Sequence, residues 1–167
     1  MSKLFKSVYY SPFGPLVLLS DSQYLLKLYP AEILEDSPIT SEEETEPIRL
    51  TRLWLDNYFK GSNPSISDIP IKADGTAFQQ KCWQLLCTIP YGKTCTYKDI
   101  ADKVAQSTPT GRMSCQAVGQ AIRKNPVLII IPCHRVIGSN GALTGYAGGL
   151  ELKEDLLHHE KTNKAVL

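Results

Sequence analysis

The residues best suited to chemistry in this chain are a neighbouring cysteine and histidine, in the segment Pro132-Cys133-His134-Arg135-Val136. An apolar run, Val127 to Ile131, precedes them, and a glycine-rich turn, Gly138 to Gly141, follows. The run predicts a buried strand that delivers the thiol into a polar turn. A cysteine beside a histidine can be held as the thiolate, the form that attacks carbon electrophiles. The alternative, on residue type alone, is an inert cysteine in the core.

The first part of the chain predicts a small antiparallel sheet and a helix. Three β-prone runs separated by turn signals predict a three-stranded meander at Leu4–Tyr10, Leu16–Leu19 and Tyr24–Tyr29. The acidic run Glu32 to Glu46 has no basic residue and predicts a solvated, mobile loop. Apolar residues at helical spacing between Leu50 and Tyr58 predict a helix that ends near Gly61.

The second part of the chain predicts short helices after a linker, Pro64 to Gly75. A helix is expected from Thr76, and the pattern Thr96-x-x-Asp99 has the form of a capping box that starts another. A further helix is expected at about Ser114 to Lys124. Its core-facing residues are predicted to be Ala117, Val118, Ala121 and Ile122. We therefore expect two domains, residues 1–74 and 75–167.

Two short helices joined by the polar loop Gln106 to Gly111 predict a helix-turn-helix. The second helix is rich in small residues, among them Gly119 on a face away from the predicted core. Small residues would let this helix approach DNA closely, but they would equally serve tight packing between helices. The helix pattern alone leaves these two interpretations open.

The distribution of charge favours a nucleic acid partner. Residues 1–75 carry 7 basic and 11 acidic side chains, whereas residues 76–149 carry 8 basic and 2 acidic. The middle of the chain is therefore strongly basic although the net charge is only +1. Such an excess suits a surface that meets phosphates, and it also occurs on ordinary solvated faces.

Composition argues against a secreted, membrane or metal-binding protein. No stretch approaches the ~18 consecutive apolar residues of a membrane span, and the N-terminus has no signal-peptide pattern. The 5 cysteines include no C-x-x-C pair, so we expect reduced thiols and no zinc site. These features predict a soluble cytoplasmic protein.

Four motifs in the second half of the chain occur in one order. They are Asn125-Pro126, Pro132 to Val136, Gly145-Tyr146-Ala147-Gly148-Gly149 and His159-Glu160. In type and spacing they closely resemble the O6-alkylguanine-DNA alkyltransferases, suicidal DNA repair proteins. The resemblance is strong from about Thr76 to Glu160 and thin before that. It implies an α+β fold, with a ribonuclease H-like N-terminal domain of three antiparallel strands and a helix, and a mostly helical C-terminal domain with a helix-turn-helix.

The resemblance also implies the catalytic roles. Cys133 is the implied nucleophile, with His134 as its base through a bridging water and Glu160 orienting the imidazole ring. Tyr97 matches the family tyrosine that contacts the flipped base, and it is the candidate proton donor to guanine. Arg135 is expected to form a structural ion pair.

Further residues are implied to line a substrate pocket. Tyr146 matches a pocket-wall tyrosine, and the backbone N–H of Ala147 would lie near the substrate oxygen. The carbonyls of Cys133 and Val136 would accept hydrogen bonds from the guanine amino group. Asn125 would tie the helix-turn-helix to the active-site segment, although asparagine is also a common helix-ending residue.

Five residues are expected to contact DNA: Lys98, Ser114, Cys115, Gln116 and Ser139. Gln116 stands where the family usually has an arginine that enters the base stack in place of the flipped base. A glutamine can fill that space and donate hydrogen bonds, but it carries no charge. At the flipping element this chain therefore departs from the usual family pattern.

The sequence thus predicts a DNA repair methyltransferase that flips O6-alkylguanine out of double-stranded DNA and moves the alkyl group to Cys133, once per molecule. O4-alkylthymine is a second candidate donor. No cofactor is expected, because the damaged base is itself the alkyl donor, and we expect a monomer with no obligate protein partner. Two alternatives are a non-catalytic lesion binder, a class in which the nucleophilic cysteine is replaced, and a thiol hydrolase that turns over small esters or peptides.

Overall fold

The computed structural model describes residues 3–33 and 41–164, and most of the predicted acidic loop lies outside these ranges. Its N-terminal part is an antiparallel sheet of β1 (Phe5–Ser11), β2 (Gly14–Ser20) and β3 (Leu25–Pro30) in the order β1-β2-β3. The predicted meander is confirmed. Ser11 pairs with Gly14, whose φ is 106°, so only two residues connect β1 to β2.

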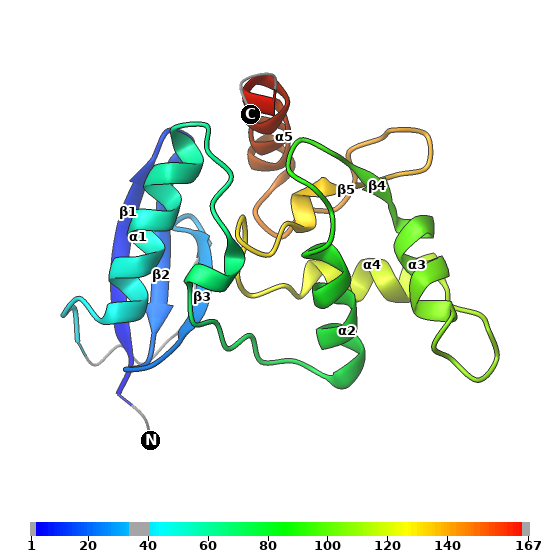
Figure 1. Cartoon of the computed structure of the whole chain (residues 1–167), viewed down its shortest axis with the longest axis horizontal. Helices are drawn as coiled ribbons and strands as arrows, with labels where there is room; N and C mark the ends of the chain where they lie inside the picture. Colours follow the sequence, from blue (N-terminus) through cyan, green and yellow to red (C-terminus); the bar gives the residue numbers. More distant parts are fainter. Residues whose placement is uncertain (1–2, 34–40, 165–167) are drawn as a thin grey trace.

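Helix α1 (Glu46–Phe59) lies against this sheet (Figure 1) and contacts all three strands. It begins where the Thr45 side chain accepts a hydrogen bond from the Ile48 backbone N–H, and it ends before Gly61, whose φ is 98°. Trp54 and Tyr58 are buried, whereas Leu53 is 52% exposed. The predicted helix is therefore confirmed, with its aromatic side chains in the core.

The C-terminal part contains the predicted short helices. It comprises 3-10 helix η1 (Ile66–Asp68), α2 (Ala77–Leu86), β4 (Cys95–Thr96), α3 (Tyr97–Ala105), α4 (Cys115–Arg123), 3-10 helix η2 (Cys133–Arg135), β5 (Val136–Ile137) and α5 (Leu150–Lys164). Thr76 and Thr96 each form a complete capping box, as the sequence predicts for Thr96. Strands β4 and β5 form one parallel pair.

Helices α3 and α4 pack together and form the predicted helix pair. Val118, Ala121 and Ile122 are buried as expected, but Ala117 is only half-buried and Gly119 is buried instead. A Cβ atom on Gly119 would lie 3.8 Å from the Tyr97 ring, an ordinary contact distance, so Gly119 lies next to the first residue of α3. Trp83 fixes the other side of α4, because its Nε1 donates to the Ala121 carbonyl at 2.9 Å.

The predicted strand at residues 127–131 is wrong. These residues are buried, but apart from one bridge between Val127 and Leu28 they form turns, in which Ile129 adopts a left-handed φ of 71°. A backbone hydrogen bond from Ile131 N to Val127 O, at 3.1 Å, closes the turn. Hydrophobicity without a clear period cannot distinguish a buried strand from a buried turn, which is why this segment was predicted as a strand.

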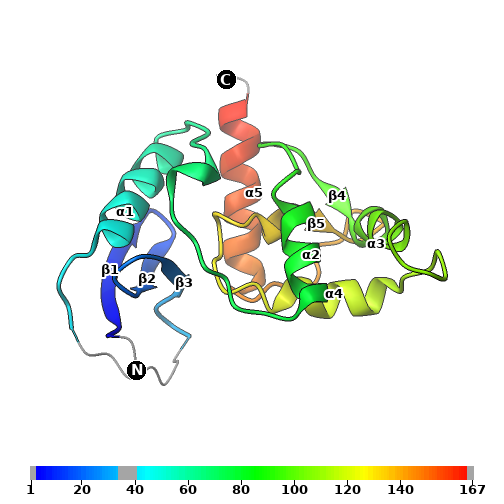
Figure 2. The same ribbon diagram turned by 60° about the horizontal axis from the view of Figure 1, so that its bottom comes forward.

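The two parts of the chain share one continuous core of buried apolar residues. Their backbones also meet directly, since Leu28 N donates to Pro126 O at 2.9 Å and Leu128 N donates to Leu28 O at 3.0 Å. Helix α5 lies between the sheet domain and helices α2 to α4 (Figure 2). Within the described residues, no helix is long and apolar enough to cross a membrane.

Candidate active site

Cys133 opens the 3-10 helix η2 and is only 2% exposed. Burial raises the pKa of its thiol to about 11, although a hydrogen bond from the Asn125 side chain and the charge of Lys153 act in the opposite direction. The thiol therefore lies inside the protein, at the start of the 3-10 turn. At neutral pH the buried sulfur keeps its proton, so its attack on carbon needs a base.

His134 follows in the same 3-10 turn and is completely buried. Its Nε2 donates to Glu160 Oε2, and its Nδ1 is buried without a hydrogen-bond partner among the described residues. Burial lowers the pKa of His134 and outweighs the opposite effect of Glu160, so the imidazole is neutral with its proton on Nε2. Nδ1 is thus the atom able to accept a proton.

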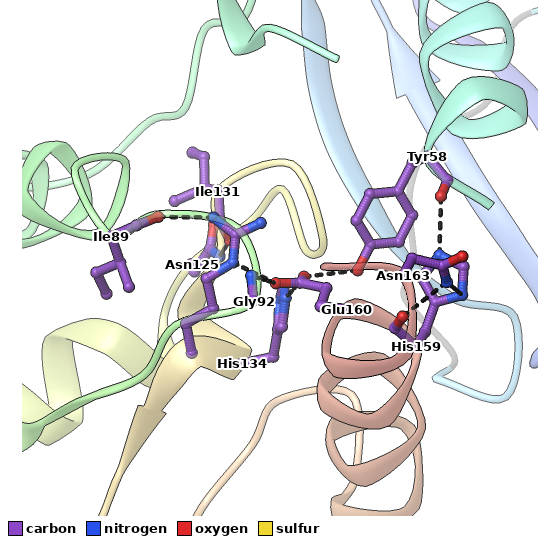
Figure 3. A network of polar contacts seen from close by, with 10 residues as sticks. Tyr58, Ile89, Gly92, Asn125, Ile131, His134, His159, Glu160 and Asn163 are labelled. Atoms are coloured by element: carbon purple, nitrogen blue, oxygen red, sulfur yellow. Dashed lines mark hydrogen bonds and ion pairs between the residues drawn. The ribbon is translucent and has the colours of Figure 1, made fainter. Parts of the chain in front are cut away.

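Glu160, on α5, receives hydrogen bonds from four groups although it is only 1% exposed (Figure 3). Oε2 accepts from His134 and from the Tyr58 hydroxyl at 2.7 Å, and Oε1 accepts from Arg135 Nε at 2.7 Å and Gly92 N at 3.1 Å. Burial alone would raise the pKa of Glu160, but these donors and the Arg135 charge hold it well below its usual range. The carboxylate therefore stays charged inside the protein.

Arg135 forms the structural ion pair that the sequence predicts. Besides Glu160, its guanidinium donates from Nη1 to the Ile89 carbonyl at 2.8 Å and lies 5.7 Å from the centre of the Tyr91 ring. The side chain is 8% exposed. Arg135 thus anchors η2 and α5 to the loop before β4.

Lys153 is a component of the site that the sequence did not predict. It is fully buried on α5, and its Nζ donates to the carbonyls of Val136 at 2.6 Å and Thr144 at 3.1 Å. Burial lowers its pKa, while Cys133 favours the charged form. One signal could have revealed it: Lys153 lies three and seven residues before Leu156 and Glu160, on the helix face that carries the buried residues.

The predicted pocket tyrosines lie close to this centre. The Tyr97 hydroxyl donates to the Thr144 carbonyl at 2.9 Å, and the Lys153 ammonium lies 5.9 Å from the Tyr97 ring centre. The Tyr146 hydroxyl is enclosed and has no partner in the described part of the chain. Burial raises the pKa of both phenols, so both remain protonated.

Strand β5 and the loop between β5 and α5 carry the remaining predicted pocket residues. Ala147 is exposed, and Val136 accepts a hydrogen bond from Lys153 through its carbonyl, which is also the predicted acceptor for guanine. Gly145 has a φ of 46°, and a Cβ atom there would lie 2.5 Å from Arg123 Nε. The left-handed φ favours glycine at this position, where the loop lies against the Arg123 side chain at the end of α4.

Asn125 connects α4 to the cysteine segment, as the resemblance implies. It is 5% exposed; its Nδ2 donates to the Ile131 carbonyl at 2.8 Å and its Oδ1 accepts from Val127 N at 3.0 Å. One side chain therefore holds both ends of the buried turn that leads from the end of α4 to Cys133.

The residues predicted to contact DNA are all exposed: Lys98, Ser114, Cys115, Gln116 and Ser139. Lys98 forms an exposed ion pair with Asp102 at 2.8 Å. Cys115 and Gln116 line an open hollow of about 330 Å³ together with Tyr97 and Thr144. The exposed face of α4 therefore adjoins the tyrosine that lies next to the buried centre.

Within residues 3–33 and 41–164, no group of three His, Cys, Asp or Glu side chains could hold a metal ion.

Two models of known protein families match this chain. The model of the 6-O-methylguanine DNA methyltransferase ribonuclease-like domain matches residues 4–73, and the model of the DNA binding domain of the same family matches residues 77–162. The chain belongs to the 6-O-methylguanine DNA methyltransferase family. It is a DNA repair alkyltransferase with the α+β fold of that family.

Relatives from distant organisms match along nearly the whole chain. A methylated-DNA–protein-cysteine methyltransferase of Haemophilus influenzae is 39% identical over 163 residues, which cover 96% of this chain and 88% of that protein. One from Methanosarcina barkeri is 41% identical over 155 residues, covering 92% and 94%. The crystal structure of Mycobacterium tuberculosis OGT in complex with DNA superposes with a TM-score of 0.84 at 37% identity, covering 95% of this chain and 94% of that one.

Proposed function

We propose that this protein transfers the alkyl group of O6-alkylguanine in double-stranded DNA to the Sγ of Cys133, once per molecule. The observation that carries the proposal is a buried thiol that adjoins, in one 3-10 turn, a neutral histidine held through Nε2 by an ionised Glu160. This arrangement leaves Nδ1 of His134 as the proton acceptor. O4-alkylthymine is a second candidate donor.

The proposed transfer begins with removal of the thiol proton. A bridging water passes the Sγ proton of Cys133 to Nδ1 of His134, and Glu160 stabilises the imidazolium that forms. The thiolate then attacks the alkyl carbon, so that an S–C bond forms while the C–O6 bond breaks and its electron pair stays on the guanine. Tyr97 donates a proton to this leaving base, and the released guanine is neutral.

The side chains and backbone groups that line the pocket around Cys133 would orient the flipped base. We assign the faces of the pocket to Tyr146, Ala147 and the carbonyls of Val136 and Cys133, with Lys153 holding the Val136 carbonyl in place. Since the thioether product has no leaving group that restores the thiol, each molecule would act once. The alkylated base supplies the group, so the step requires no cofactor.

We further propose that DNA docks on the exposed face of α4. Support comes from the exposure of Ser114, Cys115 and Gln116 on this helix, from the exposure of Lys98 and Ser139, and from the relative solved in complex with DNA. Asn125 would couple this docking to the Cys133 turn, because it spans the distance between α4 and Ile131. Base flipping is needed because a stacked O6 atom cannot reach a buried sulfur.

Three broader assignments remain proposals. We place the domain boundary between residues 74 and 75, within the segment 72–76 that forms neither helix nor strand. We propose a monomer, because one chain contains every group that the transfer requires. We propose a cytoplasmic location, because all five cysteines are free thiols, as is usual in a reducing compartment.

Substitution of the nucleophile tests this function. Cys133→Ser should lose alkyl transfer from a duplex containing O6-methylguanine, because a hydroxyl is a poor nucleophile without strong activation, and it should still bind the duplex. Cys87→Ser changes an exposed thiol and should react like the wild type. Transfer by the Cys133→Ser protein at a near wild-type rate would show that another residue accepts the group, and repeated turnover of small esters would favour a thiol hydrolase.

A further inference from the structure

The N-terminal domain contributes one side chain to the buried polar centre of the C-terminal part. Tyr58 lies at the end of α1, 102 residues before Glu160, yet its hydroxyl donates to Glu160 Oε2 at 2.7 Å. Figure 3 shows the phenol reaching from α1 to α5, with His134 on the opposite side of the same carboxylate. The N-terminal domain therefore touches the group that orients the candidate base.

The surroundings of Tyr58 fix both its position and its protonation state. The side chain is 1% exposed, its ring stacks on Trp54 with centroids 5.4 Å apart, and the Tyr91 ring packs edge-on at 6.0 Å. Burial and the negative Glu160 raise the pKa of Tyr58 well above its ordinary value. Tyr58 therefore remains a neutral phenol that can only donate its proton to this carboxylate.

A second contact locks the end of α1 onto α5. His159 Nε2 donates to the Tyr58 carbonyl at 2.8 Å, and Asn163 Nδ2 donates to the His159 carbonyl at 2.7 Å. The consecutive residues His159 and Glu160 thus bind the backbone and the hydroxyl of the same tyrosine. The orientation of the Tyr58 hydroxyl follows from how the two domains dock.

Both Tyr58 and His134 donate to Oε2, whereas Arg135 and Gly92 donate to Oε1. A hydrogen bond from a phenol withdraws negative charge from the oxygen that accepts it. Oε2 therefore attracts the His134 proton less strongly than it would without Tyr58, and this acts in the same direction as burial, which lowers the pKa of His134.

We propose that Tyr58 is a positioning residue for alkyl transfer, which fixes Oε2 of Glu160 and sets the basicity of His134, so that the relay is complete only when α1 is docked on α5. This proposal rests on the proposed function, in which His134 accepts the thiol proton. It gives the ribonuclease-like domain a defined chemical role in addition to its role in folding.

Other ionisable groups face the His134–Glu160 pair from each neighbouring element. They are Lys153 on α5, Cys133 and Arg135 on η2, Tyr91 before β4 and Tyr146 before α5. None of these side chains is changed by a substitution at Tyr58. A shift in the titration of His134 can therefore be assigned to the missing phenol hydroxyl.

The test compares Tyr58→Phe with wild type by the rate of reaction with free O6-benzylguanine, which requires no DNA docking. Tyr9→Phe is the matched control, because Tyr9 is a buried tyrosine of the same domain whose hydroxyl donates to Asp56 Oδ1 at 2.7 Å. Rates are measured from about pH 5.5 to about pH 8.5, the range over which histidine titrates. Circular dichroism confirms that each variant is folded.

Loss of the phenol leaves more negative charge on Oε2, so the pKa of His134 should rise and the acid limb of the profile should move to higher pH. A shift of about half to one pKa unit corresponds to a roughly three- to tenfold slower reaction on the acid limb, with the difference narrowing at alkaline pH. Tyr9→Phe should keep the wild-type profile. An unchanged profile for Tyr58→Phe, or the same loss of rate at every pH, would overturn the proposal.

A second variant keeps the test decisive if Tyr58→Phe fails to fold. Site-specific 3-fluorotyrosine at position 58 preserves the hydrogen bond with a stronger donor, so the acid limb should move to lower pH, and no movement would contradict the proposal. The wild-type reaction distinguishes failure of the proposed function from failure of the proposed role of Tyr58. If wild type does not gain a methyl group from a duplex carrying O6-methylguanine, the proposed function fails, whereas a reactive wild type with unshifted variants removes only the role of Tyr58.

Discussion

At the scale of single residues, one carboxylate organises the site. Glu160 holds the histidine, the arginine and a tyrosine from the other domain at once. On sequence grounds a glutamate in a polar helix is usually a solvated charge, and only the family resemblance singled it out. A residue-level signal was nevertheless present, because Leu152, Leu156 and Glu160 follow at four-residue intervals and continue one buried face of α5.

A second prediction at this scale concerns how slowly the Cys133 thiol reacts with small alkylating reagents. Because burial raises the pKa of Cys133 to about 11, we predict that iodoacetamide labels Cys133 far more slowly than the exposed Cys115, and that raising the pH to about 9 leaves this difference in place. The sign follows from the shift, since a raised pKa leaves the thiol protonated below that pH. Peptide mass mapping after timed labelling measures both sites.

Rapid labelling of Cys133 at neutral pH would contradict the buried, protonated thiol. Cys82 serves as an internal reference in the same experiment, because it is also buried and its pKa is also raised by burial.

At the scale of elements, the helices that begin with a capping residue were predictable, and the buried turn at residues 127–131 was not. Thr96 and Asp99 specify the start of α3 through local hydrogen bonds, which a sequence pattern captures directly. The turn at residues 127–131 depends instead on Asn125, which bonds both Val127 and Ile131, and on Ile129 accepting a left-handed backbone. Such a conformation is uncommon for a β-branched residue, so local preference pointed to a strand.

Helix α4 carries the prediction that belongs to this scale. Gln116 is exposed beside Tyr97 and is the candidate for filling the space that a flipped base leaves. Unstacking a base costs a few kcal/mol, so losing about 1.4 kcal/mol of compensation through Gln116→Ala should slow repair of duplex DNA roughly tenfold. Gln116→Arg should repair duplex DNA at least as fast as wild type.

Free O6-benzylguanine is the control substrate, because it requires no flipping and should react equally with all three proteins. Equal slowing of both substrates by Gln116→Ala would mean that the residue supports the pocket. No slowing of either would mean that another side chain fills the stack.

At the scale of the whole molecule, the C-terminal domain carries the basic surface, and the N-terminal domain reaches the active site through Tyr58. Six basic side chains of the middle segment are exposed: Lys93, Lys98, Lys103, Arg112, Arg123 and Lys124. This excess was visible in the composition because charge needs no tertiary contact to be counted. The contact between Tyr58 and Glu160 was not visible, since it depends on how α1 docks against α5 and spans 102 residues of sequence.

The basic surface predicts how binding responds to salt. Affinity for undamaged duplex should fall steeply with salt and show little sequence preference, with a loss of ~10³-fold between about 50 and 200 mM salt if about six phosphates are contacted. Lys124→Gln, beside α4, should reduce the slope by about one, whereas Lys72→Gln, an exposed lysine of the N-terminal part, should not. Fluorescence anisotropy with a labelled duplex measures both slopes, and a salt-independent affinity would contradict phosphate contacts by this surface.

The most direct test of the account is the mass of the protein after reaction. Wild type is incubated with a duplex carrying O6-methylguanine, and the intact protein and its peptides are then weighed. We predict a gain of one methyl group per molecule, located on the peptide that contains Cys133, together with unmodified guanine in the DNA. An unchanged protein mass with the lesion still in place, or a methyl group on a different cysteine, would contradict the central claim that Cys133 is the acceptor.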